Sequence, residues 1–156
     1  MYLTYGIDYI PQIPILLFIC IILGRKYAFI SIACYIIIGL FLPIFSAGGG
    51  IKYVLQYNFG YILAFLPAVW VATSFLDKNR KFLNCLLAIG SAVLIIHVLG
   101  GVYLTLIAIA KHDTFDFAWG LISHQSFGSI IYDFVLGYVA IMFARPAKHL
   151  LWIAMG

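Results

Sequence analysis

Residues 82–110 read FLNCLLAIGSAVLIIHVLGGVYLTLIAIA and contain no Lys, Arg, Asp or Glu. An α-helix of about 20 apolar residues spans the hydrocarbon core of a bilayer, so this stretch is long enough to cross a membrane. Its apolar residues follow one another without alternation, and the same pattern recurs at residues 15–23 and 138–143. Consecutive apolar residues exclude the alternating strands of a membrane β-barrel.

The rest of the chain has the same character. Of its 156 residues, 65% are hydrophobic and only 9% are charged, and the mean hydropathy is +1.12. Soluble domains carry about 25% charged residues, so this composition excludes a soluble globule, and the many apolar and aromatic side chains exclude a disordered chain. We predict an all-α, polytopic membrane helix bundle that forms a single domain over residues 1–156.

Charged residues, Gly and Pro divide the chain into five predicted spans, at residues 11–23, 27–45, 61–76, 82–110 and 129–144. Pro43 is expected to bend or end the second span, and Pro67 to interrupt the third. The fourth is long enough to tilt or break, with Gly100 and Gly101 as the expected place. Residues 111–127 mix polar and aromatic side chains and predict a loop with an interfacial helical portion.

The net charge of +4 is informative through its distribution. One set of alternate loops holds seven of the nine basic residues, namely Arg25, Lys26, Lys78, Arg80, Lys81, Arg145 and Lys148. Basic loops are cytoplasmic in membrane proteins, so we expect a cytoplasmic C-terminus, with residues 48–60 and 111–127 outside, and no nucleic acid partner. An outside N-terminus without a signal peptide is unusual, and it predicts a six-span protein that lacks its first helix.

Asp133 lies within the apolar stretch GSIIYDFVLGYVAIMF. A charged side chain at mid-depth in a bilayer costs roughly 2.5 to 3.5 kcal/mol, so such residues usually face a cavity. On the predicted topology Asp133 lies in the outer half of its span, where a ligand from outside can donate N–H groups to it; it could equally pair with a cation. The alternative is an interfacial Asp that stabilises a helix N-terminus.

His97 lies deep within the span AVLIIHVLGGVYL. Two roles stay open for it, either as a ligand-binding side chain or as a structural imidazole hydrogen-bonded to a neighbouring helix. Small residues on the same span are interpreted as sites of close helix approach: Ala88, Gly90, Ala92, Gly100 and Gly101.

The loop from Gly48 to Gly60 is longer than a plain connection requires. It combines Gly48, Gly49 and Gly50 with the polar and aromatic residues Lys52, Tyr53, Gln56, Tyr57, Asn58 and, at its end, Tyr61. Such a loop at membrane depth is tolerated where it lines a cavity, so it is a candidate lid over a small amphipathic ligand. A solvated linker is the alternative.

His112, Asp113, Asp116 and His124 carry ligand-type side chains, and His112 and Asp116 would share one face of a helix. The set lacks thiolates and the histidine spacing of a zinc helix, so a solvated rim is favoured over a metal site. The cysteines all lie in apolar runs and are interpreted as packing residues: Cys20, Cys34 and Cys85. We predict neither a metal nor a cofactor.

Known catalytic motifs are absent from the sequence. It has no phosphate-binding Gly loop with its Lys, no H-E-x-x-H and no G-x-S-x-G. The chain therefore cannot itself hydrolyse ATP and lacks the residues of the common membrane hydrolases, so we predict that it is not an enzyme.

Residues 39–70, GLFLPIFSAGGGIKYVLQYNFGYILAFLPAVW, resemble the signature region of the BioY family, the biotin-binding S components of energy-coupling-factor transporters. Members show an apolar helix ending in Leu-Pro-Val-Phe, a Gly-rich stretch, an element such as Thr-Phe-Gly-Tyr and a Gly-Phe-x-Pro-Ala continuation. The matching segments are residues 42–45, 48–50, 58–61 and 64–68. The stretch LIIHVLGGVYL is similar to the cyanobacterial branch.

The resemblance implies a substrate-capturing subunit for biotin or a similar small vitamin, which works with a transmembrane coupling subunit and ATPase subunits in the lipid bilayer of the cell. Asp133 stands where many members carry an aspartate that contributes to the biotin site. The sequence departs from the family at three points: Tyr57 and Asn58 replace Pro-Thr, Leu136 replaces a Lys, and the first helix has no counterpart.

Three hypotheses follow. In the first, Asp133, Asn58 and Tyr61 bond the ureido group of biotin, Lys52 pairs with its carboxylate, and the 48–60 loop caps the pocket. In the second, the chain is a non-transporting membrane scaffold without a small-molecule ligand, and His97 only packs helices. The third, an intramembrane enzyme that uses Asp133 and His97, is disfavoured because no second carboxylate or nucleophile accompanies them.

Overall fold

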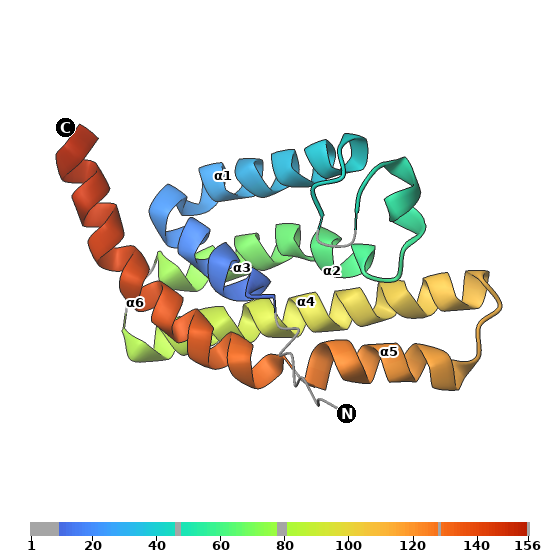
Figure 1. Cartoon of the computed structure of the whole chain (residues 1–156). Helices are drawn as coiled ribbons and strands as arrows, with labels where there is room; N and C mark the ends of the chain where they lie inside the picture. The colour runs from blue at the N-terminus through green and yellow to red at the C-terminus, as the bar shows by residue number, and fades with distance from the viewer. Residues whose placement is uncertain (1–9, 46–47, 78–80, 128, 156) are drawn as a thin grey trace, which may run out of the picture.

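The chain folds into a bundle of helices, seen in the computed structural model of Figure 1, which describes residues 10–45, 48–77, 81–127 and 129–155. Within these ranges the elements are, in order, α1 (Gln12–Phe41), the short 3-10 helix η1 (Ile51–Leu55), α2 (Phe59–Leu63), α3 (Phe65–Leu76), α4 (Phe82–Ala110), α5 (Phe115–Phe127) and α6 (Ile130–Met155). The described part holds four helical stretches long and apolar enough to cross a membrane: Gln12–Phe41, Phe59–Leu76, Phe82–Ala110 and Phe115–Ala154. The predicted all-α bundle is confirmed.

The first of these helices is bent in two at Gly24. Its φ of 72° and ψ of 174° are accessible to glycine and strained for other residues. The chain turns sharply there, and the two segments of α1 diverge from this bend (Figure 1). Arg25 fastens this turn to the end of α3, where its guanidinium donates to Thr73 Oγ1 and to Asp77 Oδ2, each at 3.2 Å. The turn at residues 24–26 is therefore where the sequence predicts it.

Pro43 and Pro67 act as expected, whereas α6 continues through Pro146, beyond the expected end of the last span at residue 144. α1 ends at Phe41, two residues before Pro43. The next span is divided into α2 and α3 at Ala64. Pro67 explains this division, because it has no N–H to donate and its ring clashes with the carbonyl four residues earlier, at Leu63.

The expected break at Gly100 and Gly101 is wrong, because α4 runs unbroken from Phe82 to Ala110. Gly100 instead lets another helix approach closely. A Cβ on Gly100 would lie 2.4 Å from Cδ1 of Tyr61, and a Cβ on Gly60 would lie 2.3 Å from Cβ of Tyr103. The two glycines bring α2 and α4 into contact, which confirms for Gly100 the interpretation as a site of close helix approach.

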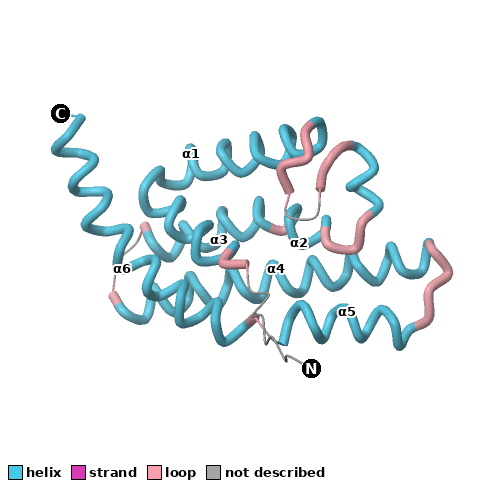
Figure 2. The backbone as a smooth tube through the Cα atoms, viewed as in Figure 1, coloured by secondary structure: helices cyan, strands magenta, loops and turns pink. Residues whose placement is uncertain are grey.

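Residues 111–127 are more helical than expected. Only a short connection follows α4, and α5 then runs back along the C-terminal half of α4 toward α6, as the tube in Figure 2 shows. The helical portion expected in this segment is present as α5, and it continues the direction of α6 instead of standing apart from the bundle.

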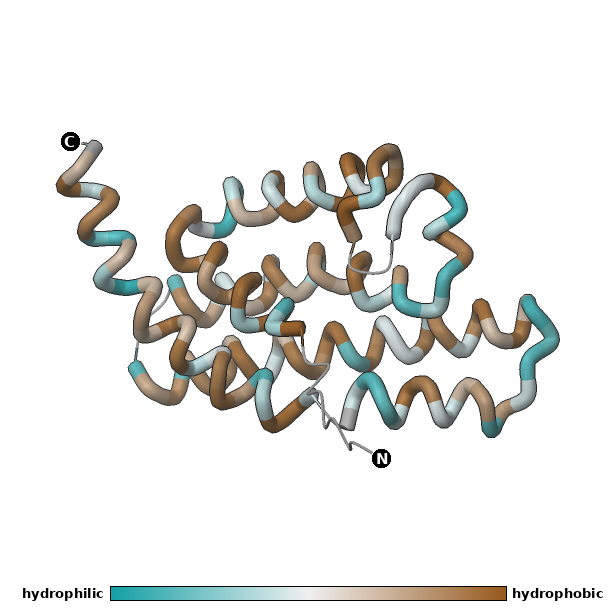
Figure 3. The backbone as a smooth tube through the Cα atoms, viewed as in Figure 1, coloured by the Kyte–Doolittle hydropathy of each residue, from teal (hydrophilic) through white to brown (hydrophobic). Residues whose placement is uncertain are grey.

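The interior is closely packed and the exterior is apolar as well. α1 packs mainly against α6 and α3, and α4 packs against α2, α3 and α6. Leu17, Ile89 and Ile141 are fully buried, whereas apolar side chains such as Leu94 (64% exposed) face outward. In Figure 3 hydrophilic positions gather at the η1–α2 loop and the α4–α5 turn. An apolar outer surface with polar ends fits a lipid surrounding.

Candidate functional site

Four polar side chains from four different helices converge inside the bundle. They are Tyr61 on α2, His97 on α4, Ser126 on α5 and Asp133 on α6. His97 Nδ1 lies 3.0 Å from Ser126 Oγ, and His97 Nε2 lies 3.6 Å from Asp133 Oδ2. The ring of Tyr61 packs edge-on against the imidazole, with 6.0 Å between the ring centroids. We call these four residues the polar cluster.

Asp133 is held in the first turn of α6, where its N–H donates to the carbonyl of Ser129 at 2.8 Å. This is the position that the helix-cap alternative requires. However, Asp133 is only 3% exposed and faces the imidazole of His97, so it is not an interfacial residue in contact with water. A buried carboxylate beside an imidazole has the environment of a binding group rather than that of a surface cap.

The polar cluster lies near the middle of the bundle. His97 is about 20 Å from either end of α4, at a rise of about 1.5 Å per residue. Because Asp133 contacts His97, it lies level with the middle of α4. At this depth each unpaired polar atom is costly, so the cluster demands either internal partners or a ligand.

Tyr61 presents a hydroxyl that lacks such a partner. The residue is 6% exposed, and its hydroxyl makes no hydrogen bond within the described part of the chain. The ring is fixed by its contact with Gly100 on one side and by His97 on the other. The hydroxyl of Ser126 also lies beside that of Tyr61. Tyr61 therefore offers a rigidly held donor to the polar cluster.

The loop that joins α1 to α2 is packed onto the protein and is not a solvated linker. Its aromatic residues Phe45 and Tyr53, and Phe59 at the start of α2, are each at most 4% exposed, and their rings pack against one another in tilted and edge-on arrangements. The hydroxyl of Tyr103 on α4 donates to the carbonyl of Val54. The segment from residue 48 to residue 58 thus lies against the C-terminal half of α4.

A second contact ties this loop to the α4–α5 turn. The hydroxyl of Tyr57 donates to Asp113 Oδ2 at 2.5 Å, and Lys111 Nζ lies 4.0 Å from the centroid of the Tyr57 ring. The hydrogen bond to the carboxylate, followed by burial and the charge of Asp113, raises the pKa of Tyr57 above its ordinary value. Tyr57 therefore joins two connections that are far apart in the sequence.

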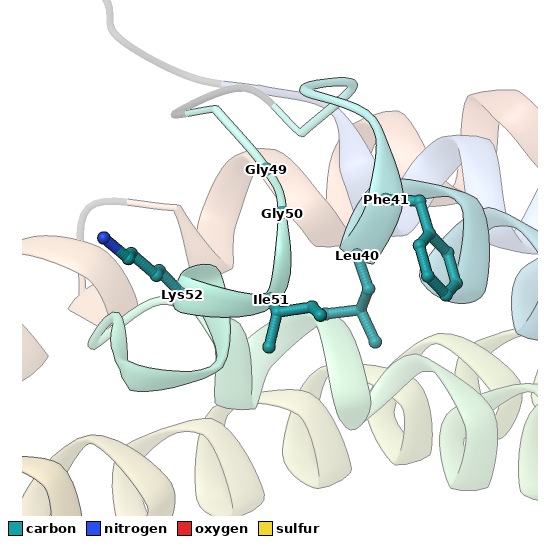
Figure 4. A pocket seen from close by; sticks show the side chains of 6 residues that line it. All are labelled: Leu40, Phe41, Gly49, Gly50, Ile51 and Lys52. Atoms are coloured by element: carbon teal, nitrogen blue, oxygen red, sulfur yellow. The ribbon is translucent and has the colours of Figure 1, made fainter.

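The remaining predicted site residues lie elsewhere. Gly49, Gly50 and Lys52 line a shallow, open hollow of about 360 Å³ together with Leu40, Phe41 and Ile51. In Figure 4 the Lys52 side chain extends away from Leu40 and Phe41. Asn58 is half-buried just before α2 and makes no capping hydrogen bond with its side chain. None of these four residues contributes to the polar cluster.

Ser126 was not predicted from the sequence. A serine in the mixed segment SHQSFGS carries no signal, because serine is common at helix ends and in loops. Only the packing of α5 against α4 brings it to His97.

The other ligand-type residues of this region, His112, Asp116 and His124, are exposed, and the described residues contain no group of three His, Cys, Asp or Glu able to hold a metal ion. Cys20 and Cys85 are buried and Cys34 is exposed, all as free thiols.

Comparison with known proteins identifies the family. The sequence model of the BioY family matches residues 6–152. The chain belongs to the BioY family. A curated BioY relative, the probable biotin transporter BioY of Lysinibacillus sphaericus, is 47% identical over 58 residues, which are 36% of this chain and 30% of the relative. The match thus spans less than a third of that relative's length.

A solved structure shares the BioY fold found here. The crystal structure of the S-component for biotin from an ECF-type ABC transporter superposes with a TM-score of 0.72 and 19% identity, covering 90% of this chain and 75% of that chain. At this identity the likeness establishes the fold, a multi-pass membrane bundle. Both findings agree with the family resemblance carried by residues 39–70.

Proposed function

We propose that the chain is the membrane-embedded substrate-binding (S) subunit of an energy-coupling-factor transporter and that it captures biotin or a similar small vitamin. The observation that carries the proposal is the polar cluster, in which Asp133 and the hydroxyl of Tyr61 are buried deep in an apolar bundle of a BioY family member. The likeness to a probable biotin transporter and to an S-component for biotin supports the same substrate.

The donors and acceptors of the polar cluster complement a ureido group. A ureido ring offers N–H donors on either side of a carbonyl acceptor. The carboxylate of Asp133 accepts from an N–H group, and the unpaired hydroxyl of Tyr61 donates to the carbonyl. A charged acceptor makes the stronger hydrogen bond, so Asp133 contributes most to affinity. The amide of Asn58, three residues before Tyr61, is a further partner for the same group.

The loop from residue 48 to residue 58 acts as the lid. Gly49 and Gly50 let it turn above the end of α1, and the positive φ of Gly50, 86°, requires glycine. Lys52 is the proposed partner of the ligand carboxylate, and Tyr57 holds the lid to Asp113. Because the Lys52 side chain extends away from Leu40 and Phe41 and Lys52 is not part of the polar cluster, its role requires the lid to move when ligand binds.

Ser126, His97 and Asp133 are the residue types of a hydrolase triad, yet their arrangement favours binding. In a triad the serine hydrogen-bonds Nε2 and the aspartate Nδ1, whereas here serine is on Nδ1 and aspartate on Nε2. Ser126 lies within α5, where backbone N–H groups are engaged in the helix and cannot form an oxyanion hole. The chain is a binding component, not an enzyme.

Transport requires further chains in this proposal. A transmembrane coupling subunit and ATPase subunits drive uptake, because the sequence has no phosphate-binding loop. The ligand enters from outside, and the C-terminus is cytoplasmic. We also propose that the fold is the six-helix form, of which residues 11–144 supply five spans. The stretch LIIHVLGGVYL supports a place in the cyanobacterial-like branch.

Calorimetric titration of the purified chain with biotin tests the function. We expect saturable binding at micromolar ligand or below, together with a rise in the unfolding temperature. Biotin methyl ester is the matched ligand, since it keeps the ureido group and lacks the carboxylate; it should bind more weakly because it loses the charge partner. Absence of binding and of any thermal shift with biotin or other vitamins would favour the scaffold hypothesis.

A further inference from the structure

Ser126 on α5 contacts His97 on α4, and His97 in turn contacts Asp133 on α6. We call the pair of Ser126 and His97 the arm. Ser126 is 8% exposed and Asp133 is 3% exposed, so this arm lies inside the protein. The contact of Ser126 Oγ with Nδ1 of His97, at 3.0 Å, is a hydrogen bond, and the second contact, from Nε2 to Asp133 Oδ2 at 3.6 Å, is an ion-pair distance slightly too long for one. Each ring nitrogen of His97 therefore faces one polar side chain.

These two contacts determine which ring nitrogen of His97 carries a proton. A neutral imidazole carries one proton, on either Nδ1 or Nε2. A proton on Nδ1 alone would leave the lone pair of Nε2 facing the carboxylate of Asp133, which is repulsive. A hydroxyl proton donated by Ser126 to Nδ1 places the ring proton on Nε2, where it points at Asp133. The neutral form with this tautomer and the imidazolium both put a proton on Nε2.

From this geometry we infer that Ser126 and His97 are positioning residues for Asp133, with Ser126 fixing the imidazole so that Nε2–H faces the carboxylate and holds it in place for the ligand. The inference rests on the proposed function for the identity of the ligand. It adds an assignment for Ser126, and it makes α5 part of the site although α5 supplies no group that touches the ligand. Second partners of this kind commonly fix the orientation of a histidine at metal sites, by the same physics.

A purely structural role would give a different result. If Ser126 only satisfied a buried imidazole, loss of its hydroxyl would lower stability and leave affinity unchanged. If Ser126 positions Asp133 through His97, loss of the Ser126 hydroxyl lowers the affinity for the ligand. This effect on affinity disappears when His97 is absent. Ser126→Ala removes one oxygen and little volume, so the fold is retained.

Nitrogen-15 NMR of histidine-labelled protein in detergent tests the arm without any ligand. We expect Nε2 of His97 to be protonated in the unaltered chain. Ser126→Ala should shift the Nδ1 signal, whereas Ser126→Thr, which keeps the hydroxyl, should restore it. A bare Nε2, or an Nδ1 signal indifferent to Ser126→Ala, would overturn the inference. This readout stands even if biotin is the wrong ligand.

Biotin titrations test the consequence for binding. Ser126→Ala should weaken affinity about fivefold, as expected for one hydrogen bond, and Ser126→Thr should restore it. In a His97→Phe background, Ser126→Ala should have no further effect, because the arm is already broken. Additive losses in the double variant would overturn the positioning role. Ser123→Ala is the matched control, since its hydroxyl bonds only the carbonyl of Gly120 on the same helix. Failure of the unaltered chain to bind biotin would contradict the proposed function alone.

Discussion

Asp133 shows how one residue acquires a role from its surroundings. On α6 it follows apolar neighbours, and by burial it loses the hydration that a carboxylate has in water. The imidazole of His97 offsets part of this cost. A ligand that supplies N–H donors bonds such a carboxylate strongly, because hydrogen bonds to an ionised acceptor are strong. Burial of the charge thus affects two quantities, the stability of the empty protein and its affinity for a ligand.

Asp133→Asn separates these two effects. The substitution keeps the shape of the side chain and removes the charge, so affinity for biotin should fall more than tenfold, about 1.4 kcal/mol. The unfolding temperature without ligand should stay the same or rise, because a buried charge is removed. Calorimetry and thermal unfolding in detergent measure the two quantities. Asp116→Asn, at an exposed position on α5, is the control. Unchanged affinity would return Asp133 to the role of a helix cap.

Single residues of the site could be predicted where they contrast with their neighbours. Asp133 and His97 are polar within long apolar spans, and that contrast alone selects them. Ser126 lies in a polar segment, where nothing distinguishes it from Ser123. Its role depends on which helix α5 packs against, and that is a property of the tertiary structure. Lys52 was selected by its charge, but charge does not reveal the direction in which a side chain points.

The contact between α2 and α4 is the element-scale feature on which the site depends. Gly100→Ala should force a methyl group into the ring of Tyr61, whose Cδ1 lies 2.4 Å from the added Cβ. We expect a loss of about 1–3 kcal/mol in the free energy of unfolding and weaker biotin binding as Tyr61 is displaced. Thermal unfolding and calorimetry measure both.

The adjacent glycine provides the control for this substitution. A Cβ on Gly101 meets no atom of the described residues within 4 Å, and alanine is a better helix former than glycine by up to about 1 kcal/mol. Gly101→Ala should therefore be neutral or stabilising and should leave biotin affinity unchanged. Equal losses from both substitutions would contradict close packing of α2 on Gly100.

The contact between the loop and the α4–α5 turn predicts a pH dependence. The pKa of Tyr57 is raised in the folded protein, mainly by its hydrogen bond to Asp113. A raised pKa means that the contact contributes fully below the ordinary pKa of tyrosine, about 10, and is lost as pH rises through the raised value. The difference in absorbance between the unaltered chain and Tyr57→Phe, followed as pH rises, should show one tyrosine that ionises at a higher pH than an ordinary tyrosine. Asp113→Asn should return this ionisation to lower pH, and an unchanged titration would contradict the contact.

The turns and ends of helices were predictable where a residue at a break in the pattern has one expected effect on the backbone. Proline removes a donor and crowds the preceding turn, so the ends near Pro43 and Pro67 were found, although α6 continues through Pro146. Gly24 lies beside charged residues at a break in hydropathy, which indicates a turn. The pair Gly100 and Gly101 has two meanings, a break in the helix or a close contact. Only the position of Tyr61 decides between them, and this pairing of α2 with α4 is not visible in either segment alone.

At the scale of the whole molecule, lipid replaces water as the main solvent. Large apolar side chains on the outer faces of α1, α4 and α6 are exposed, and hydrophilic positions are concentrated near connections (Figure 3). The composition predicted this exterior without any structure. What it left open is the depth of each residue. The length of α4 on either side of His97 then places the polar cluster near the middle of that helix.

The direction in which this bundle crosses the membrane is the last prediction. Lys26 and Lys52 are exposed and flank the second segment of α1, one at each end. Because basic loops are retained in the cytoplasm, Lys26 should lie inside and Lys52 outside. The three native cysteines are first replaced by Ala, and Lys26→Cys and Lys52→Cys are made separately. A membrane-impermeant maleimide applied to intact cells should label only the Lys52→Cys variant, whereas permeabilised cells should show both labelled. The reverse pattern would place the lid on the cytoplasmic side, and a lid there could not admit a vitamin from outside.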